Sequence, residues 1–321
     1  MKPTAPWPCN FPRVCHGTLD FIQVPGFPSA IHVFAFTHSR RNVVQRYPWL
    51  ISFSFGQRTL HLERTIMNNP IIPVSPSDQS CCPIVELRQY TLHPEKRDIL
   101  IELFDRQFVE SQEAVGMKVI GQFRDLDDPN RFVWLRGFRD MPSRAQALQN
   151  FYGGPVWKTH REVANTTMID SDNVLLLRPA HANTAFPFSA SNRLPLGVNQ
   201  PAKGLLVATI YYFDAPVEKE FTDFFDRLLW PMLVSAGASI IACLVTERSP
   251  NNFPALPVRE GENVFISFSR FPDAAAYERY LAVLARSPRW SGEISEELRR
   301  RLKGHPQTLK LSPTARSQLT A

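Results

Sequence analysis

The chain from residue 84 to residue 180 alternates between two hydrophobic periods. The stretch IVELRQYTL places Ile84, Glu86, Arg88 and Tyr90 on one face, which is the period of a β-strand. Apolar positions then recur at helical spacing until Gly116, a residue typical of a helix end. In chain order, the pattern predicts the strand IVELRQYTL, a helix from Pro94 to Gly116, the strands KVIGQFRDL and RFVWLRGF, a helix through SRAQALQNFY, and the strand NVLLLRP.

The same order of elements returns between residue 204 and about residue 314. A shift of 121 residues matches Tyr90 to Tyr211, and beyond a 12-residue insertion a shift of 133 residues matches Trp157 to Trp290. Chance rarely aligns so many aromatic residues, so the matches indicate an internal duplication. The other identities pair Phe104, Asp105, Arg106 and Gly116 with Phe225, Asp226, Arg227 and Gly237, and Phe132, Phe138, Asp140 and Pro155 with Phe265, Phe271, Asp273 and Pro288.

Each unit has the order β-α-β-β-α-β, the ferredoxin-like arrangement in which both helices cover one face of a four-stranded sheet. The other face needs its own cover, and a second unit in the same chain supplies it. We therefore predict an α+β fold in which two tandem ferredoxin-like repeats pack face to face as a barrel-type pair. Association into a homo-oligomer is compatible with this fold but is not required by it.

The predicted domain boundaries follow from this pattern. Residues 1–83 form an irregular, proline-rich leader, and we expect translation to begin at Met67. The first unit spans 84–180 and the second 204–314, joined by a linker at 181–203 and followed by a tail at 315–321.

Charge and cysteine usage exclude several classes of function. The net charge of +6 lies mostly in residues 1–66, and residues 67–321 carry a balance of only +1, which removes the main support for nucleic-acid binding. Five cysteines form no zinc spacing and no closed disulfide framework, so a reducing, cytoplasmic location is expected. A mitochondrial location is the alternative for a eukaryotic source, although prolines interrupt the acid-poor leader. The chain has no apolar run long enough to cross a bilayer.

No motif predicts a metal or a cofactor. The acidic turn of Asp125, Asp127 and Asp128 lacks the glycine and glutamate of a calcium loop, so solvated side chains are expected there. Gly153 and Gly154 do not form a phosphate-binding loop.

The stretches ELRQYTLHPEKRDILIELF, MKVIGQFRDLDDPNRFVWLRGF and FYGGPVWK resemble the NIPSNAP family. The resemblance covers residues 84–180, and the second unit resembles a diverged copy. It implies a dimeric α/β barrel, the superfamily that also contains cofactor-free monooxygenases and haem-degrading enzymes. It further implies roles in vesicle transport and mitochondrial quality control, but it supplies no catalytic residues to transfer.

Polar and aromatic residues on two predicted strands form the candidate site. If Glu86, Arg88 and Tyr90 on the first strand and Trp134 and Arg136 on the third face the barrel interior, they line a partly enclosed pocket. Arg88, Trp134 and Arg136 would bind a small anionic or aromatic ligand, and Tyr90 and Glu86 are the catalytic candidates. The alternative is a satisfied ionic network in which Glu86 pairs with Arg88 or Arg136.

The second unit retains only the tyrosine of this set. Its matching residues are Val207, Thr209, Tyr211, Ser267 and Ser269, which suggests one working pocket in the first unit and one supporting copy. Other conspicuous residues favour structural roles: His160 on an exposed helical turn, Trp157 in packing, and Cys243 in the core.

Two functions fit these observations. The first is a protein of the NIPSNAP type that binds a small molecule or a partner without catalysis. The second is a cofactor-independent monooxygenase or isomerase in which Tyr90 or Glu86 moves a proton and Arg88 or Arg136 stabilises an oxyanion. Only the second requires Glu86 and Tyr90 to reach an open cavity.

Overall fold

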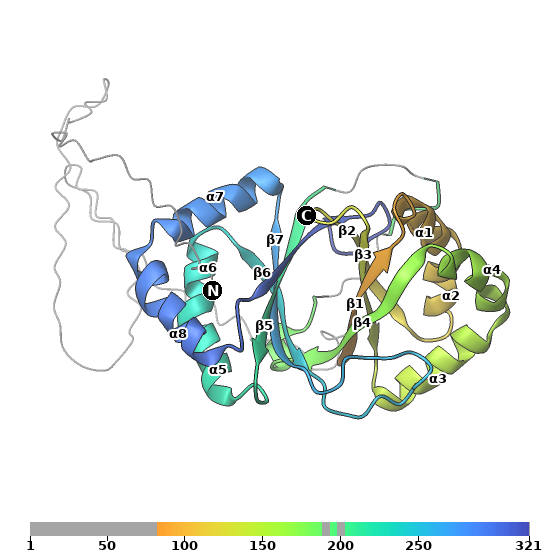
Figure 1. Cartoon of the computed structure of the whole chain (residues 1–321), viewed down its shortest axis with the longest axis horizontal. Coiled ribbons are helices and arrows are strands. Elements are labelled where there is room, and N and C mark those ends of the chain that lie inside the picture. The colour runs from red at the N-terminus through yellow and green to blue at the C-terminus, as the bar shows by residue number, and fades with distance from the viewer. Residues whose placement is uncertain (1–81, 188–192, 198–202, 321) are drawn as a thin grey trace, which may run out of the picture. The chain divides into compact units, whose positions relative to one another are not determined.

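The computed structural model describes residues 82–187, 193–197 and 203–320. The predicted leader, with the expected start at Met67, lies outside these residues apart from its last two positions. Within the described part of the chain, strands and helices follow the predicted order (Figure 1).

The first half of the fold comprises the elements from β1 to β4. A continuous helical segment with one π-helical turn, η1, follows β1 and ends at Gly116, whose φ of 94° favours glycine. Asp140 caps the next helix, since its carboxylate accepts a hydrogen bond from the Ser143 amide at 2.7 Å, and this helix ends at Gly153, before Pro155. The elements are β1 (Ile84–Leu92), α1 (Arg97–Leu103), η1 (Phe104–Phe108), α2 (Val109–Glu113), β2 (Lys118–Asp125), β3 (Arg131–Phe138), α3 (Met141–Gly153), α4 (Pro155–Asn165) and β4 (Met168–Pro179).

The second half comprises the elements from β5 to β8, after a short 3-10 turn η2 (Ala182–Thr184), and it repeats the local features of the first. Its first helical segment contains a π-helical turn at the matching place and ends at Gly237, with φ of 115°. Asp273 caps the next helix through the Ala276 amide at 2.7 Å. The elements are β5 (Leu205–Phe213), α5 (Lys219–Phe224), η3 (Phe225–Leu229), α6 (Trp230–Ser235), β6 (Ser239–Thr246), β7 (Asn263–Phe271), α7 (Ala274–Ala285), η4 (Trp290–Ile294), α8 (Ser295–Arg301) and β8 (Gln307–Pro313).

The eight strands close into one barrel in the order β1-β3-β2-β8-β5-β7-β6-β4. All pairs are antiparallel, and two of them, β2 with β8 and β4 with β6, join the halves. The mixed α/β fold and the barrel within one chain are therefore confirmed. The two sheets bury their inner faces against each other inside the barrel, and they also join edge to edge, which leaves no strand edge unpaired in the barrel.

The barrel interior is apolar. Val85 and Leu87 of β1 point into it and pack with Leu206 and Ala208 of β5. Because successive strand residues point to opposite faces, Glu86, Arg88 and Tyr90 point outward. Each half covers its outer face with its own helices, and Figure 1 shows the two helical layers on opposite sides of the barrel.

The insertion between β6 and β7 crosses from the second half to the first. The Glu247 amide donates to the Leu176 carbonyl at 2.9 Å, and the Arg259 amide donates to the Val174 carbonyl at 2.8 Å. Farther along the same loop, Asn252 Nδ2 donates to the Met141 carbonyl at the start of α3 at 2.6 Å, and Figure 1 shows the loop beside that helix.

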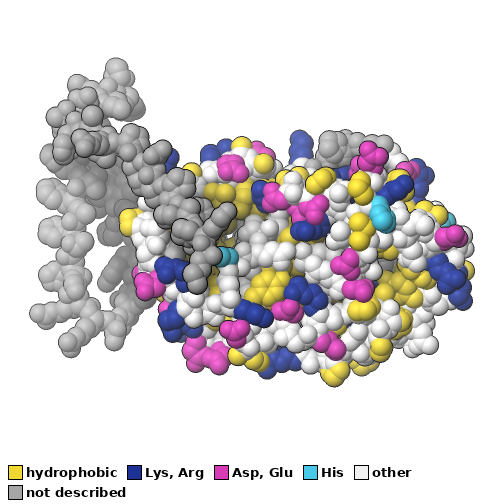
Figure 2. All heavy atoms as spheres, in the orientation of Figure 1, with side chains coloured by type: hydrophobic (Ala, Val, Ile, Leu, Met, Phe, Trp, Pro, Cys, Tyr) yellow, Lys and Arg dark blue, Asp and Glu magenta, His cyan; other side chains and the backbone are white. Residues whose placement is uncertain are grey.

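The described surface shown in Figure 2 mixes acidic and basic side chains rather than gathering one sign. None of the helices in the described ranges is long and apolar enough to span a bilayer.

Candidate functional site

Glu86 accepts hydrogen bonds from three arginine side chains beneath the helices of the first half. Its Oε2 lies 2.7 Å from Arg88 Nη1 and 2.8 Å from Arg136 Nε, and its Oε1 lies 2.7 Å from Arg144 Nε. The side chains of Glu86, Arg136 and Arg144 are 0% exposed. The four residues Glu86, Arg88, Arg136 and Arg144, hereafter the ionic cluster, form the ionic network around Glu86 that the sequence left open as an alternative.

The structure brings all five predicted site residues together. Arg88 Nε donates to Tyr90 Oη at 2.9 Å, and the Arg136 guanidinium lies 5.1 Å from the Trp134 ring centroid. The expectation that these side chains face the barrel interior is wrong. They lie on the outer face of the sheet because Val85 and Leu87 occupy the inner one.

The protonation states within the ionic cluster disfavour proton transfer. Burial alone would raise the pKa of Glu86, but the guanidiniums of Arg136, Arg88 and Arg144 outweigh it and hold that pKa well below its usual range. Burial raises the pKa of Tyr90 despite the neighbouring Arg88. Glu86 therefore stays ionised and Tyr90 stays protonated near neutral pH, and neither group is a ready base.

The insertion from the second half closes the ionic cluster. Arg144 Nη1 donates to Asn252 Oδ1 at 2.7 Å and to Asn251 Oδ1 at 3.1 Å. Phe253, the next residue, stacks on Tyr152 with ring centroids 6.0 Å apart and planes 29° apart. The loop thus provides two hydrogen-bond acceptors for Arg144 Nη1 and an aromatic partner for Tyr152.

The same sheet positions in the second half carry small side chains. In the first half, Glu86 lies opposite Arg136, and Arg88 lies opposite Trp134. In the second half, the corresponding pairs are Val207 opposite Ser269 and Thr209 opposite Ser267. Removing this bulk leaves a cavity of about 660 Å³ between the outer face of the sheet and the helices, hereafter the second-half pocket. Its volume lies within the range of small-molecule sites.

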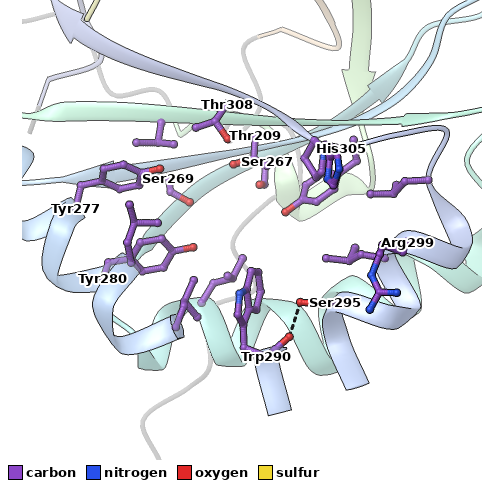
Figure 3. Close-up of a pocket in the computed structure, with 18 of the residues that line it drawn as sticks. Thr209, Ser267, Ser269, Tyr277, Tyr280, Trp290, Ser295, Arg299, His305 and Thr308 are labelled. Atoms are coloured by element: carbon purple, nitrogen blue, oxygen red, sulfur yellow. Dashed lines mark hydrogen bonds between the residues drawn. The ribbon is translucent and has the colours of Figure 1, made fainter. Parts of the chain in front are cut away.

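The second-half pocket combines hydroxyl groups with aromatic rings. Figure 3 shows hydroxyl side chains on the sheet facing rings on the helices, with Tyr277 and Tyr280 at one end and Arg299 and His305 at the other. The sheet contributes Thr209, Tyr211, Ser267, Ser269 and Thr308, and the helical layer contributes Tyr277, Tyr280, Trp290 and Ser295.

Burial keeps the tyrosines of this pocket neutral. It raises the pKa of Tyr211, whose hydroxyl also bonds Ser267, and it raises the pKa of Tyr280 and of Tyr277. These phenols can donate hydrogen bonds to a ligand but are poor bases. The pocket lining contains no aspartate or glutamate, and its basic side chains are Arg299, Lys303 and His305.

Sequence reasoning missed the second-half pocket and also Arg144. The signal for the pocket was present, because four large side chains of the first unit match Val207, Thr209, Ser267 and Ser269 in the second. The smaller side chains of the second unit leave empty space between the sheet and the helices that cover it. Arg144 matches Tyr277 at the shift of 133 residues, which shows that the whole ionic cluster, and not only its sheet members, is replaced.

Residues given structural roles behave mostly as expected. Cys243 is buried, and burial raises the pKa of its thiol. Trp157 packs against the rings of Phe108 and Phe151. His160 is half-buried, with its ring 6.4 Å from that of Phe108, rather than solvated.

The acidic turn differs in one respect from its expectation. Asp125 is buried instead of solvated, since it accepts from the Asp127 amide at 2.9 Å and from Arg131 Nη1 at 3.2 Å. Within the residues the structure describes, no group of His, Cys, Asp and Glu side chains is arranged to hold a metal ion.

Comparisons with known proteins identify the first half. Residues 85–183 match the family model for NIPSNAP. No curated protein sequence matches the chain.

Similar solved structures include a NIPSNAP-like domain protein from Burkholderia xenovorans, with 26% identity, 35% of this chain and 90% of that chain covered, and a TM-score of 0.28. A NIPSNAP family protein from Agrobacterium tumefaciens is 19% identical over 30% of this chain and 92% of its own, with a TM-score of 0.28. A candidate monooxygenase from Fusobacterium nucleatum is 12% identical over 75% of this chain and 97% of its own, with a TM-score of 0.45.

Proposed function

We propose that this chain, which carries a NIPSNAP domain at residues 85–183, binds a small organic molecule in the second-half pocket. The observation that carries the proposal is the cavity of about 660 Å³ at the sheet positions where the first half places its ionic cluster. Hydroxyl groups on one wall and aromatic rings on the other suit a flat ligand with polar substituents.

We further infer that the two halves are tandem ferredoxin-like repeats of one duplicated unit. Matching π-helical turns, a glycine with positive φ after each, and an aspartate cap on each following helix support this origin. In this interpretation, the first repeat is closed by its ionic cluster and supports the barrel. The second repeat, expected from sequence to be the supporting copy, holds the ligand.

The alternative function is a cofactor-independent monooxygenase or isomerase that uses the first half. It needs Glu86 and Tyr90 to reach a substrate, whereas both are buried and bonded to arginine. Their shifted pKa values also oppose proton transfer near neutral pH. These observations count against catalysis by Glu86 and Tyr90 in the first half.

A thermal-shift screen of the full chain tests the proposal. The probes are naphthols, naphthoates, flavones and benzoquinones, because they are flat and carry polar groups. A compound that binds the native state stabilises it by about 2.7 kcal/mol at 100 times its Kd, which is enough to raise Tm measurably. Ser269→Phe places a ring inside the pocket, where it obstructs a flat ligand, and should abolish the shift. Ala282→Phe places the same ring on an exposed position of α7 that does not line the pocket, and it should preserve the shift.

The result against the proposal is equally specific. If no probe shifts the wild-type protein, or if Ser269→Phe responds as the wild type does, the second-half pocket is not the binding site.

A further inference from the structure

We propose that the ligand of the second-half pocket is a hydroxylated aromatic carboxylate whose acid group lies at the Arg299 end. This inference rests on the proposed binding function and adds the chemical class of the ligand and its orientation. It comes from the distribution of charge around the pocket.

The basic groups of the pocket all lie on one short segment. Arg299 on α8 and Lys303 and His305 in the following loop line the pocket, and no carboxylate does. In Figure 3, Arg299 and His305 lie at the end of the pocket away from Tyr277 and Tyr280. A ligand with one anionic end therefore has one favourable direction in this pocket, and a cationic ligand has none.

Arg299 differs from its neighbours on α8 in its partners. Arg300 and Arg301 both pair with Glu297. Within the described residues, Arg299 has no ion pair, so its guanidinium is available for a ligand. An arginine fork binds a carboxylate through two parallel hydrogen bonds, which makes a carboxylate a fitting group at this end.

The opposite end suits a ring that carries a hydroxyl group. The rings of Tyr277 and Tyr280 stack at 5.8 Å and 23°, and Trp290 lies on the helical side between the two ends. Ser267, Ser269 and the protonated phenols can donate to or accept from a phenolic hydroxyl. Aromatic walls with hydroxyl groups along one side favour a flat ring system over a flexible chain.

Isothermal titration of the full chain with two probes tests the inference. The acid probe is 6-hydroxy-2-naphthoate, which has a carboxylate and a hydroxyl at opposite ends of a flat ring system. The neutral probe, naphthalene-2,6-diol, has a hydroxyl in place of the carboxylate. We expect the acid to bind about tenfold more tightly than the diol, the gain typical of a charge-assisted hydrogen bond.

Two neighbouring substitutions provide a matched pair of variants. Arg299→Gln should weaken binding of the acid by about tenfold and leave binding of the diol unchanged. Arg300→Gln removes the adjacent arginine, which does not line the pocket, and should change neither. Ser269→Phe should abolish binding of both probes.

If the acid and the diol bind equally, or if Arg299→Gln and Arg300→Gln have equal effects, the pocket binds aromatic compounds but the proposed acid end is wrong. If neither probe binds, both this inference and its choice of ligand class fail, and the thermal-shift screen decides separately whether the pocket binds anything else.

Discussion

Arg136 lies directly opposite Glu86 on neighbouring strands and donates a hydrogen bond to its carboxylate at 2.8 Å, with neither side chain exposed. The matching pair in the second half, Ser269 opposite Val207, lines an open pocket. The same pair of strand positions thus holds a buried ion pair in the first half and forms the wall of a pocket in the second.

Replacing Glu86 with glutamine should strongly destabilise the fold. The amide removes the one carboxylate that three buried guanidiniums share, and breaking a buried pair in this way costs about 3–5 kcal/mol. Urea unfolding of the full chain measures the loss. Glu293→Gln, which removes a half-exposed carboxylate paired with Arg289 on the surface, is the control and should have little effect. Equal losses for the two variants would show that the ionic cluster does not support the first half.

The contribution of Glu86 should depend on pH in a defined direction. Its pKa in the folded state lies below the ordinary value of 4.5, so its stabilising effect is complete above that value and is lost as the pH falls through the folded value. The difference in unfolding free energy between wild type and Glu86→Gln should therefore be constant above about pH 5.5 and shrink at lower pH. Asp105, whose pKa burial raises to about 6, is present in both proteins and cancels in the difference. A difference that grows on acidification would contradict the assigned charge of Glu86.

Removing the Asn252 side chain should loosen the insertion that covers the first half. Asn252→Ala leaves a buried Arg144 donor without its 2.7 Å partner and also breaks the bond to the Met141 carbonyl, at a cost of about 1–3 kcal/mol. Hydrogen exchange should rise in the loop and at the start of α3 while β5 and β7 stay protected. Asn150→Ala, on the exposed side of α3, serves as the control. Unchanged exchange in the loop would mean that Asn252 does not hold it closed.

Filling the pocket should be far less costly than filling the barrel. Ser269→Phe can place its ring in the cavity of about 660 Å³, so stability should change little. Ala208→Phe puts the same ring inside the barrel at a residue with 0% exposure, where overpacking costs about 1–3 kcal/mol or more. Thermal unfolding of the two variants compares them directly. A larger loss for Ser269→Phe would show that the cavity is not free to accept a side chain.

The fold was largely predictable because the hydrophobic periods indicate the order of strands and helices along the chain. The alternation of Val85 and Leu87 with Glu86 and Arg88 predicted the strand, and the aromatic identities predicted that the same order of elements returns in the second half. Which face of the strand lies inside the barrel was not predictable in the same way. The charged face looked like the lining of a site, and only the closed barrel shows that the two apolar residues point inward.

The site was predictable only in part. The cluster around Glu86 was found because its charges are conspicuous. Arg144 was not, because it lies on α3, far from Glu86 in sequence, and the hydrophobic pattern does not show that the two side chains meet. The pocket was missed because small residues such as Ser267 and Ser269 attract no attention individually. Small residues on a strand form a pocket only where helices cover that face of the sheet, and the sequence does not show where the helices lie.

A crystal structure of the full chain with 6-hydroxy-2-naphthoate is the most direct test of the central claim. The account predicts the ring system between β5, β7 and α7, beside Tyr280 and Trp290, with the carboxylate at Arg299. A ligand bound instead against Arg88 or Arg136 in the first half, with the second-half pocket empty, would contradict it.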